Sequence, residues 1–445
     1  MRSSRRWQRV AAAATISVAA AGCDRTDRII APVEQAPEKA VDPGFFFPVG
    51  DVVSNFTSGL ASSAVCTAGG NASQPLLLPA GYQQTVVAME PQYDDLADMN
   101  TVNETGPQRG RYLYKTHEIG TNGSVSVTDL VTGVTRTLAK RADWERLDGI
   151  VWTPWGTLLA AEETGMAAVK DPAVPEAVGG LVYEINPTTG VSRPLPAIGS
   201  RSHEGLRFDA EGNLYGISEA NPGYIYKFIP DFAGDLSAGQ LYALKVLRPD
   251  GDRTGDAVWI PLDRQAVRVN SQTTAAAAGA TGYDRPEDVE TGTSTGNSAG
   301  GPNILYVAIT GEDRVLAVDL KARGGVRVSD YVKVGLNVSD AFDFPDNLAL
   351  DKAGNLYIAE DPGGTFSTGK RIGDDVWRAA PSKDGVSASP SVLRFLTVTD
   401  CDAEPTGIYL NRLSDIFFVN VQHRGGDGRD LTVAVTKPGP TTAAP

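Results

Sequence analysis

Histidine and cysteine are scarce in this sequence, with three residues of each among 445. A histidine-rich zinc site would have few residues from which to be built. Basic residues are also in deficit, since 40 Lys and Arg face 54 Asp and Glu, for a formal net charge of −14. Without a basic stripe to displace the counterions of phosphates, nucleic acid is not an expected partner. An acidic chain is instead suited to binding cations.

Long helix-forming stretches are scarce as well, whereas Gly (48) and Pro (28) are plentiful. This composition favours many short strands joined by turns, so the expected fold class is all-β. A chain of this length would form two or three domains unless a repeat makes it one. The search for a repeat therefore decides the architecture.

The N-terminus has the features of a targeting segment. Arg2, Arg5, Arg6 and Arg9 precede an apolar stretch at 10–21, which is too short to span a bilayer and is followed by Cys23. This resembles a bacterial lipoprotein signal over residues 1–22, with Cys23 lipidated and the body exported to the envelope or periplasm on a membrane anchor. A plain cleaved signal with an incidental cysteine is the alternative.

The regions that flank the body have low complexity. Residues 23–75 are rich in Pro, Ala, Ser and Gly and are expected to form a flexible tether, and 436–445 a disordered tail. In an oxidising compartment Cys66 and Cys401 could pair, since a circular fold brings its ends together. Two unrelated free thiols are the alternative.

A pattern recurs between these ends. It is clearest in "ERLDGIVWTPWGTLLAAEE" (145–163), "HEGLRFDAEGNLYGISEA" (203–220) and "FPDNLALDKAGNLYIAED" (344–361). Each unit has an acidic residue, a strand, a turn with Gly, a second strand and another acidic residue, which predicts a hairpin. Looser copies bring the number of units to six, and further strands between them would complete four-stranded blades. The sequence predicts a six-bladed β-propeller over 76–435.

Carboxylates would converge at the centre of such a fold. The leading acids of the units are Glu104, Asp148, Glu204, Glu287, Asp346 and Glu404; the trailing positions are Glu118, Glu162/Glu163, Glu219, Glu312/Asp313, Glu360/Asp361 and Gln422. Their mutual repulsion calls for cations, and oxygen ligands suit hard ions such as Ca²⁺. Solvated turn residues are the alternative, and this is the preferred interpretation for Asp209, Glu211, Asp351 and Lys352.

The segments "TPWGTLLAAEET", "HEGLRFDAEGNLYGISEANPGYIYKF", "AGATGYDRPED" and "DNLALDKAGNLYIAED" together resemble the PhoX alkaline phosphatases. The resemblance implies a six-bladed propeller, exported by the twin-arginine route, whose calcium–iron cluster hydrolyses phosphomonoesters. It also implies that Glu162, Glu204, Glu287 and Glu360 bind metal and that Arg285 holds the phosphate. Glu118 completes the expected ligand set.

One departure from the family affects the choice of metal. Asp148 stands where the family has a cysteine iron ligand, and is expected in the catalytic centre beside Arg285. A carboxylate is a hard donor that accepts Ca²⁺, Mg²⁺ or Fe³⁺, whereas a thiolate favours iron. Calcium is therefore the expected cofactor, and Fe³⁺ is in doubt.

Several side chains keep two interpretations. His117 and His203 each precede a candidate glutamate, so they either orient metal ligands or pack, and His423 is expected on the surface. A cluster of Trp144, Trp152 and Trp155 either packs between blades or walls a substrate pocket.

The expected function is a metal-dependent phosphomonoesterase that acts on a small phosphorylated or other anionic substrate. The alternatives are a calcium-dependent lactonase on the same propeller and a non-catalytic binding protein with structural calcium.

Overall fold

The computed structural model describes residues 44–47, 56, 58–292, 303–322, 325–361, 372–411 and 416–437. By its internal contacts the chain divides into Met1–Glu34 and Gln35–Pro445, and all described residues belong to the second unit. Cys23 and the predicted signal peptide lie outside the described residues.

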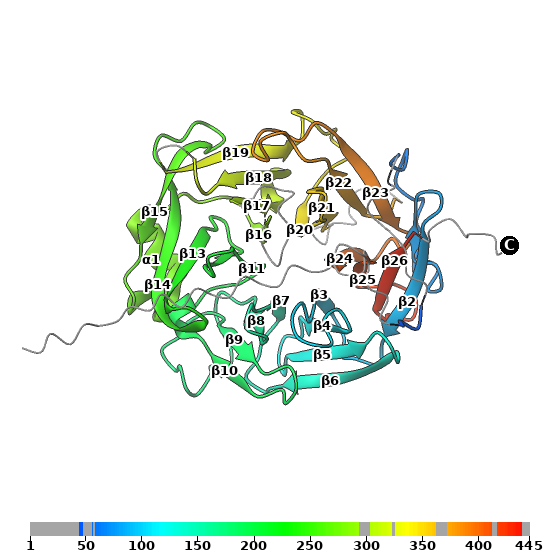
Figure 1. Ribbon diagram of the computed structural model, residues 1–445, viewed down its shortest axis with the longest axis horizontal. Helices are drawn as coiled ribbons and strands as arrows, with labels where there is room; N and C mark the ends of the chain where they lie inside the picture. Colours follow the sequence, from blue (N-terminus) through cyan, green and yellow to red (C-terminus); the bar gives the residue numbers. More distant parts are fainter. Residues whose placement is uncertain are drawn as a thin grey trace, which may run out of the picture. The chain divides into compact units, whose positions relative to one another are not determined.

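Strands dominate the described structure, as the composition predicts, and they form five antiparallel sheets (Figure 1). One sheet contains β3 (Ala97–Val102), β4 (Tyr112–His117), β5 (Ser124–Asp129) and β6 (Val134–Lys140), and the next contains β7 (Leu147–Trp152), β8 (Leu158–Glu162), β9 (Val182–Ile185) and β10 (Ser192–Pro194).

A nine-stranded sheet follows along the chain. Its first half contains β11 (Leu206–Phe208), β12 (Leu214–Ile217), β13 (Ile225–Phe232) and β14 (Asp235–Val246). Its second half contains β16 (Pro286–Thr291), β17 (Ile304–Ile309), β18 (Arg314–Asp319) and β19 (Val326–Lys333). The halves join where β15 (Gly255–Pro261) pairs with both β14 and β19.

The last two sheets contain strands from both ends of the described chain. In one, β1 (Leu76–Leu77) pairs with β23 (Val392–Val398), beside β22 (Asp375–Ala379), β21 (Leu356–Glu360) and β20 (Pro345–Leu350). In the other, β2 (Gln83–Met89) pairs with β26 (Leu431–Thr436), beside β25 (Ile416–Gln422) and β24 (Glu404–Asn411).

One helix and two short 3₁₀ turns complete the described elements. These are α1 (Ala266–Ala278), η1 (Pro196–Ile198) and η2 (Thr310–Glu312). Helix α1 ends at Gly279, whose left-handed φ of 73° terminates the helix and lets its N–H bond back to carbonyls of the last turn. In the described residues no helix has the length and apolar character required to cross a bilayer.

The innermost strands of the sheets are β3, β7, β11, β16, β20 and β24. They contact one another in that order, and β24 returns to β3, which closes a ring (Figure 1). Between consecutive sheets lie the hydrophobic clusters, such as Val151, Leu159 and Leu206 with Tyr226. Radial sheets with cores between them form a β-propeller-like fold, so the all-β class is confirmed.

Residues 58–75 differ from the flexible tether that the sequence predicts. Leu60 N–H donates to the Arg394 carbonyl at 2.9 Å, Val65 bridges to Ile372, and Cys66 is disulfide-bonded to Cys401. Backbone hydrogen bonds and the covalent link therefore attach this segment to the body. The pairing of the two cysteines is present as predicted.

Asp209 and Asp351 have the turn role preferred from the sequence. The Oδ1 of Asp209 accepts the N–H groups of Glu211 and Asn213, and the Oδ1 of Asp351 accepts those of Ala353 and Asn355. Each carboxylate thus closes its own hairpin turn rather than reaching the centre of the fold.

Candidate active site

An acidic cavity of about 510 Å³ lies at one end of the innermost strands. Arg285 and His423 are its basic residues, and Thr406 and Gln422 are neutral. The other eleven lining residues are acidic: Asp98, Glu118, Asp148, Glu163, Glu204, Glu219, Glu287, Asp346, Asp361, Asp402 and Glu404. The convergence predicted from the repeat therefore occurs.

Irregular pairing accompanies several of these acids. The register between innermost and second strands shifts at 97–100, 147–150, 286–289 and 345–348, and within these intervals lie Asp98, Asp148, Glu287 and Asp346. A β-bulge adds a residue on one strand and redirects its side chain. The bulges thus account for how acids within strands turn into the cavity.

Glycines let the inner strands approach closely beside these acids. A Cβ on Gly149 would lie 2.2 Å from the carbonyl oxygen of Glu204, and one on Gly205 would lie 1.6 Å from Oδ1 of Asp288. Neither distance is possible for a real Cβ. The Asp-Gly and Glu-Gly pairs of the repeat therefore combine an acid for the cavity with space for the neighbouring strand.

Burial and mutual repulsion raise the pKa values of the cavity acids. Burial first, then the charge of Asp98, raises the pKa of Asp148 well above its usual range, and burial with the charge of Asp148 does the same for Glu204. The pKa of Asp98 rises to about 7, and that of Glu163 to about 10, again chiefly through burial. Without cations, several of these carboxyl groups would have to hold protons at neutral pH.

The residues present fit a metal. Oxygen atoms of Glu163, Glu204 and Glu219 all lie within 4.8 Å of one another, a spacing that one cation could bridge. The Oδ1 of Asp148 is buried and has no hydrogen-bond partner in the described part of the chain. A donor set made of oxygen atoms suits hard cations.

Comparison with known proteins identifies the family to which the chain belongs. Over residues 149–425, more than half of the chain, the sequence matches the family model of alkaline phosphatase PhoX. The chain belongs to the PhoX alkaline phosphatase family. Among curated proteins, a sequence search finds no significant match.

A solved PhoX structure shares the fold. PhoX of Pseudomonas fluorescens, in complex with the transition-state analogue vanadate, superposes with a TM-score of 0.62 at 17% identity, over 84% of this chain and 98% of that one. A putative gluconolactonase matches with a TM-score of 0.47 at 11% identity (81% and 93% covered), and virginiamycin B lyase of Staphylococcus aureus with 0.44 at 11% (80% and 99%).

The PhoX family is metal-dependent, in agreement with the carboxylate cluster. Arg285, which the resemblance assigns to phosphate, lies in the cavity. Its Nε donates to Glu219 at 2.8 Å, and its other nitrogens lie 2.8 Å from Glu287 and 3.5 Å from Asp361. Three carboxylates thus hold a guanidinium whose side chain is still 37% exposed.

Glu162 and Glu360, predicted as metal ligands, are oriented differently. Glu162 accepts the backbone N–H groups of Glu145 (3.0 Å) and Leu181 (2.9 Å). Glu360 accepts those of Asp343 and Asp375 and the indole N–H of Trp377. Neither lines the cavity, since backbone donors hold both carboxylates between strands. Their neighbours Glu163 and Asp361 line it instead.

Asp98 replaces Glu104 as the leading acid of the first unit. Glu104 follows the end of β3 and accepts the hydroxyl of Tyr409 at 2.5 Å, whereas Asp98 lies within the bulge and lines the cavity. The signal was available in the sequence, because Ala97-Asp98-Met99 aligns with Leu147-Asp148-Gly149. Asp402 also lines the cavity, and the repeat gives no signal for it.

The structure decides between the two interpretations of His117 and His203. His117 bonds to the Asp95 carbonyl and to the Ser126 hydroxyl, and His203 lies 3.0 Å from the Gly199 carbonyl. Burial lowers the pKa of His117 to about 3, so it is neutral. These contacts match packing rather than ligand orientation. His423 is exposed, as expected, and it also lines the cavity, 3.5 Å from Glu404.

Proposed function

We propose that the acidic cavity is the catalytic centre of a metal-dependent phosphomonoesterase. The observation that carries this is a single arginine among eleven carboxylates, and burial and repulsion raise the pKa values of several of these acids, Asp148 and Glu204 among them. Cations bound there would neutralise the acids and polarise the phosphoryl oxygens of a substrate. The same proposal takes β15 as a link between two blades, which gives six blades in all.

Different residues of the cavity would bind the cations, bind the phosphoryl group and position Arg285. Glu118, Asp148, Glu163, Glu204 and Glu287 would hold cations, since their oxygens face the cavity. Arg285 would bind two phosphoryl oxygens and stabilise the charge that spreads over them during transfer. Glu219 and Asp361 would keep the guanidinium in place, because both contact it from the side of the cavity wall.

Calcium is the proposed principal cation, and Asp148 is the reason. Its carboxylate is a hard donor at the place of the soft thiolate that favours iron in the family. We expect Asp148→Cys to bind more iron than the wild type and to gain a thiolate-to-iron absorption band. Asp94→Cys, on the surface beside Lys140, is the matched control. An iron-rich wild type would contradict the assignment.

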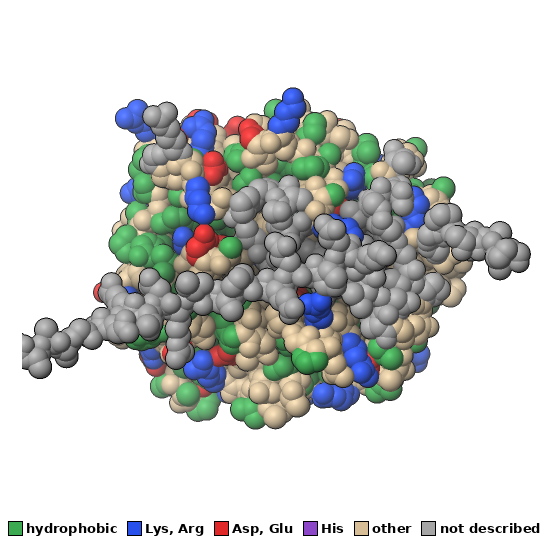
Figure 2. Space-filling model, viewed as in Figure 1, with side chains coloured by type: hydrophobic (Ala, Val, Ile, Leu, Met, Phe, Trp, Pro, Cys, Tyr) green, Lys and Arg blue, Asp and Glu red, His purple; other side chains and the backbone are tan. Residues whose placement is uncertain are grey.

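Substrate and location extend the proposal. The substrate would be a small phosphate monoester, because a cavity of about 510 Å³ accommodates little more than one compact ligand. On the face seen in Figure 2, Lys and Arg side chains are spread among acidic ones, which gives no support to nucleic-acid binding.

Lipidation of Cys23 would place the enzyme on the membrane in the bacterial envelope. Labelling with a radioactive fatty acid would test this location.

Metal analysis and a phosphatase assay test the function together. Protein purified without chelator should contain calcium and hydrolyse p-nitrophenyl phosphate, and chelator should abolish this activity. Glu204→Gln should reduce turnover by at least about 100-fold. The loss of a residue that only supports a metal ligand costs up to about 100-fold, and Glu204 would itself be a ligand. Glu211→Gln, in an exposed turn beside Lys321, is the control. Full activity of Glu204→Gln, or of chelated protein, would refute the proposal.

A further inference from the structure

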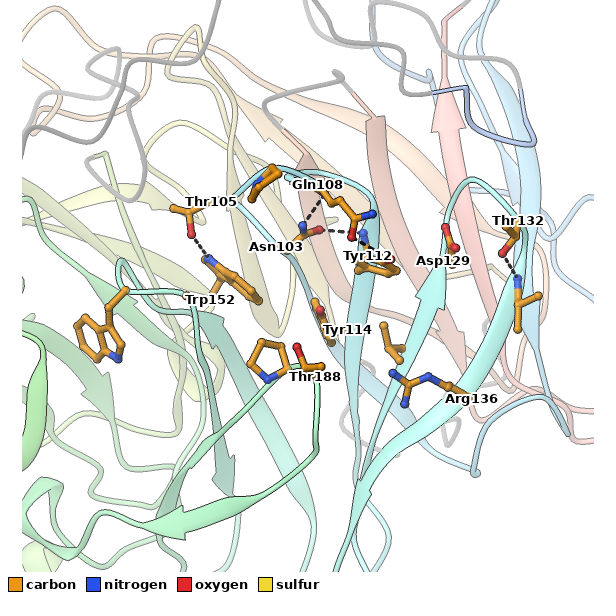
Figure 3. Close-up of a pocket in the computed structure, with 17 residues that line it drawn as sticks. Asn103, Thr105, Gln108, Tyr112, Tyr114, Asp129, Thr132, Arg136, Trp152 and Thr188 are labelled. Carbon is orange, nitrogen blue, oxygen red and sulfur yellow. Dashed lines mark hydrogen bonds between the residues drawn. The ribbon is translucent and has the colours of Figure 1, made fainter.

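A second cavity, larger than the acidic one, lies apart from it. It is a groove of about 1030 Å³ between the β3–β6 sheet and the β7–β10 sheet, shown in Figure 3. Tyr112 and Asp129 line it from the strand ends opposite to those that lead to Glu118 and the acidic cavity. The catalytic chemistry proposed above makes no use of this groove.

One wall of the groove is a face of the β3–β6 sheet that is buried at Tyr114 and Val127 and exposed at its edge on β6. Tyr112 pairs with Asp129 and Tyr114 with Val127 across β4 and β5, and the same rows continue on β6 as Val134 and Arg136. The opposite wall consists of Trp152, Trp155 and the turn with Pro187 and Thr188. In Figure 3, Tyr114 and Thr188 lie between Trp152 and Arg136.

Aromatic rings form the floor of the groove and are held in place. Tyr114 stacks on Trp152 with ring centroids 5.8 Å apart and an interplanar angle of 26°. The indole N–H groups of Trp152 and Trp155 are donated to Thr105 and Glu184. The ring of half-buried Tyr112 is oriented by its hydroxyl, which donates to Gln108 at 3.1 Å. Rigid aromatic surfaces of this kind bind ligands at a low cost in conformational entropy.

Hydrogen-bond donors surround the aromatic floor. The hydroxyl of Thr188 and the guanidinium of Arg136 are exposed in the groove. Asp129 is neutralised by Arg111, at 2.9 and 2.7 Å. Within the described ranges Arg136 has no ion-pair partner, and its hydrogen bond to the Thr137 carbonyl is long, at 3.4 Å. The groove therefore combines aromatic faces with an uncompensated positive charge.

This combination matches a sugar that carries a carboxylate. The face of an aromatic ring is partially negative and attracts the C–H groups on one face of a pyranose ring. A guanidinium binds a carboxylate through two parallel hydrogen bonds. We propose that the groove between the β3–β6 and β7–β10 sheets is a binding site for an acidic saccharide, with Arg136 on the carboxylate and Tyr112 against the sugar ring. The proposal does not depend on the phosphatase function.

Calorimetry with matched disaccharides tests the proposal on the full-length protein as purified. The disaccharide of galacturonic acid should bind saturably, and the neutral disaccharide of galactose at least about tenfold more weakly, because it lacks the charge-assisted hydrogen bonds. Arg136→Gln should lose about the same factor for the acidic disaccharide. Arg327→Gln, which alters an exposed arginine paired with Asp256, should bind like the wild type.

A second pair of variants tests the aromatic contact. Tyr112→Ala should weaken binding of the acidic disaccharide, whereas Tyr112→Phe keeps the ring and should retain most of it; thermal unfolding checks that both are folded. No saturable binding at millimolar disaccharide would overturn the proposal. So would equal affinity for the acidic and neutral sugars, or an Arg136→Gln variant that binds like Arg327→Gln.

Discussion

The two ends of the innermost strands contain the same kind of residue in opposite states. At one end, eleven acids line a cavity of about 510 Å³ with one arginine among them. At the other, a void of only about 20 Å³ remains, lined by Arg207 and Glu290, which lie 3.2 Å apart. Arg207 also lies 3.9 Å from Asp288, farther along the same inner strand toward the cavity. The backbone N–H of Leu348 also donates to Asp288 at 2.8 Å. The comparison shows that buried acids mark a binding site only where the fold leaves their charge uncompensated.

The largest loss of stability is expected at the end of the innermost strands where Arg207 compensates the buried acids. Arg207→Met would leave Asp288 and Glu290 buried without their cation, which should lower the free energy of unfolding by about 3–5 kcal/mol. Glu204→Gln at the cavity end should cause no such loss in chelated protein, because burial and the neighbouring acids already disfavour the charged form of Glu204. Urea denaturation measures both, with Arg327→Met as an exposed control. Equal losses of unfolding free energy for Arg207→Met and Glu204→Gln would contradict the proposed difference between the two ends of the innermost strands.

A loss of stability of intermediate size is expected for Glu162→Gln, but not for the same substitution at the adjacent Glu163. Glu162→Gln places an amide against the backbone N–H groups of Glu145 and Leu181, so we expect a stability loss of about 1–3 kcal/mol. Glu163→Gln should leave the stability of metal-free protein unchanged or higher and should weaken calcium binding. Denaturation and calcium titration check the pair. The assignment fails if the Glu162 variant, rather than the Glu163 variant, loses calcium.

The smallest effect is a pH dependence of the metal-free protein. The pKa of Asp98 is about 7 in the fold, above its ordinary value near 4, so between these values the folded chain holds a proton that the unfolded chain releases. The free energy of unfolding should therefore fall as pH rises through this window, by up to about 1.4 kcal/mol per pH unit for each such group. Thermal unfolding in chelator from pH 5 to 7 measures this slope.

Excess calcium provides the control for that slope. Because bound cations replace protons as the compensating charge, the dependence should flatten when calcium is added at the same pH values. Parallel profiles with and without calcium would show that the cavity acids are not the groups that titrate.

The fold and the convergence of acids were predictable because the repeat places each acid at an equivalent strand end. Which member of an acidic pair faces the cavity was not predictable. In Glu162-Glu163 and Glu360-Asp361, alternation along a strand sends one side chain to the cavity and the other to backbone donors, and the sequence alone does not say which. Bulges add to this, since one extra residue reverses the direction of the next side chain.

The pairing of β2 with β26 has a consequence for biosynthesis. The ring cannot close until Leu431–Thr436 has left the ribosome, so Asp98 and Glu118 near the start of the body meet Asp361 and Glu404 only after nearly the whole chain has been made. A translation product that ends before Asp361 would therefore lack the carboxylates that Asp361 and Glu404 contribute to the cavity.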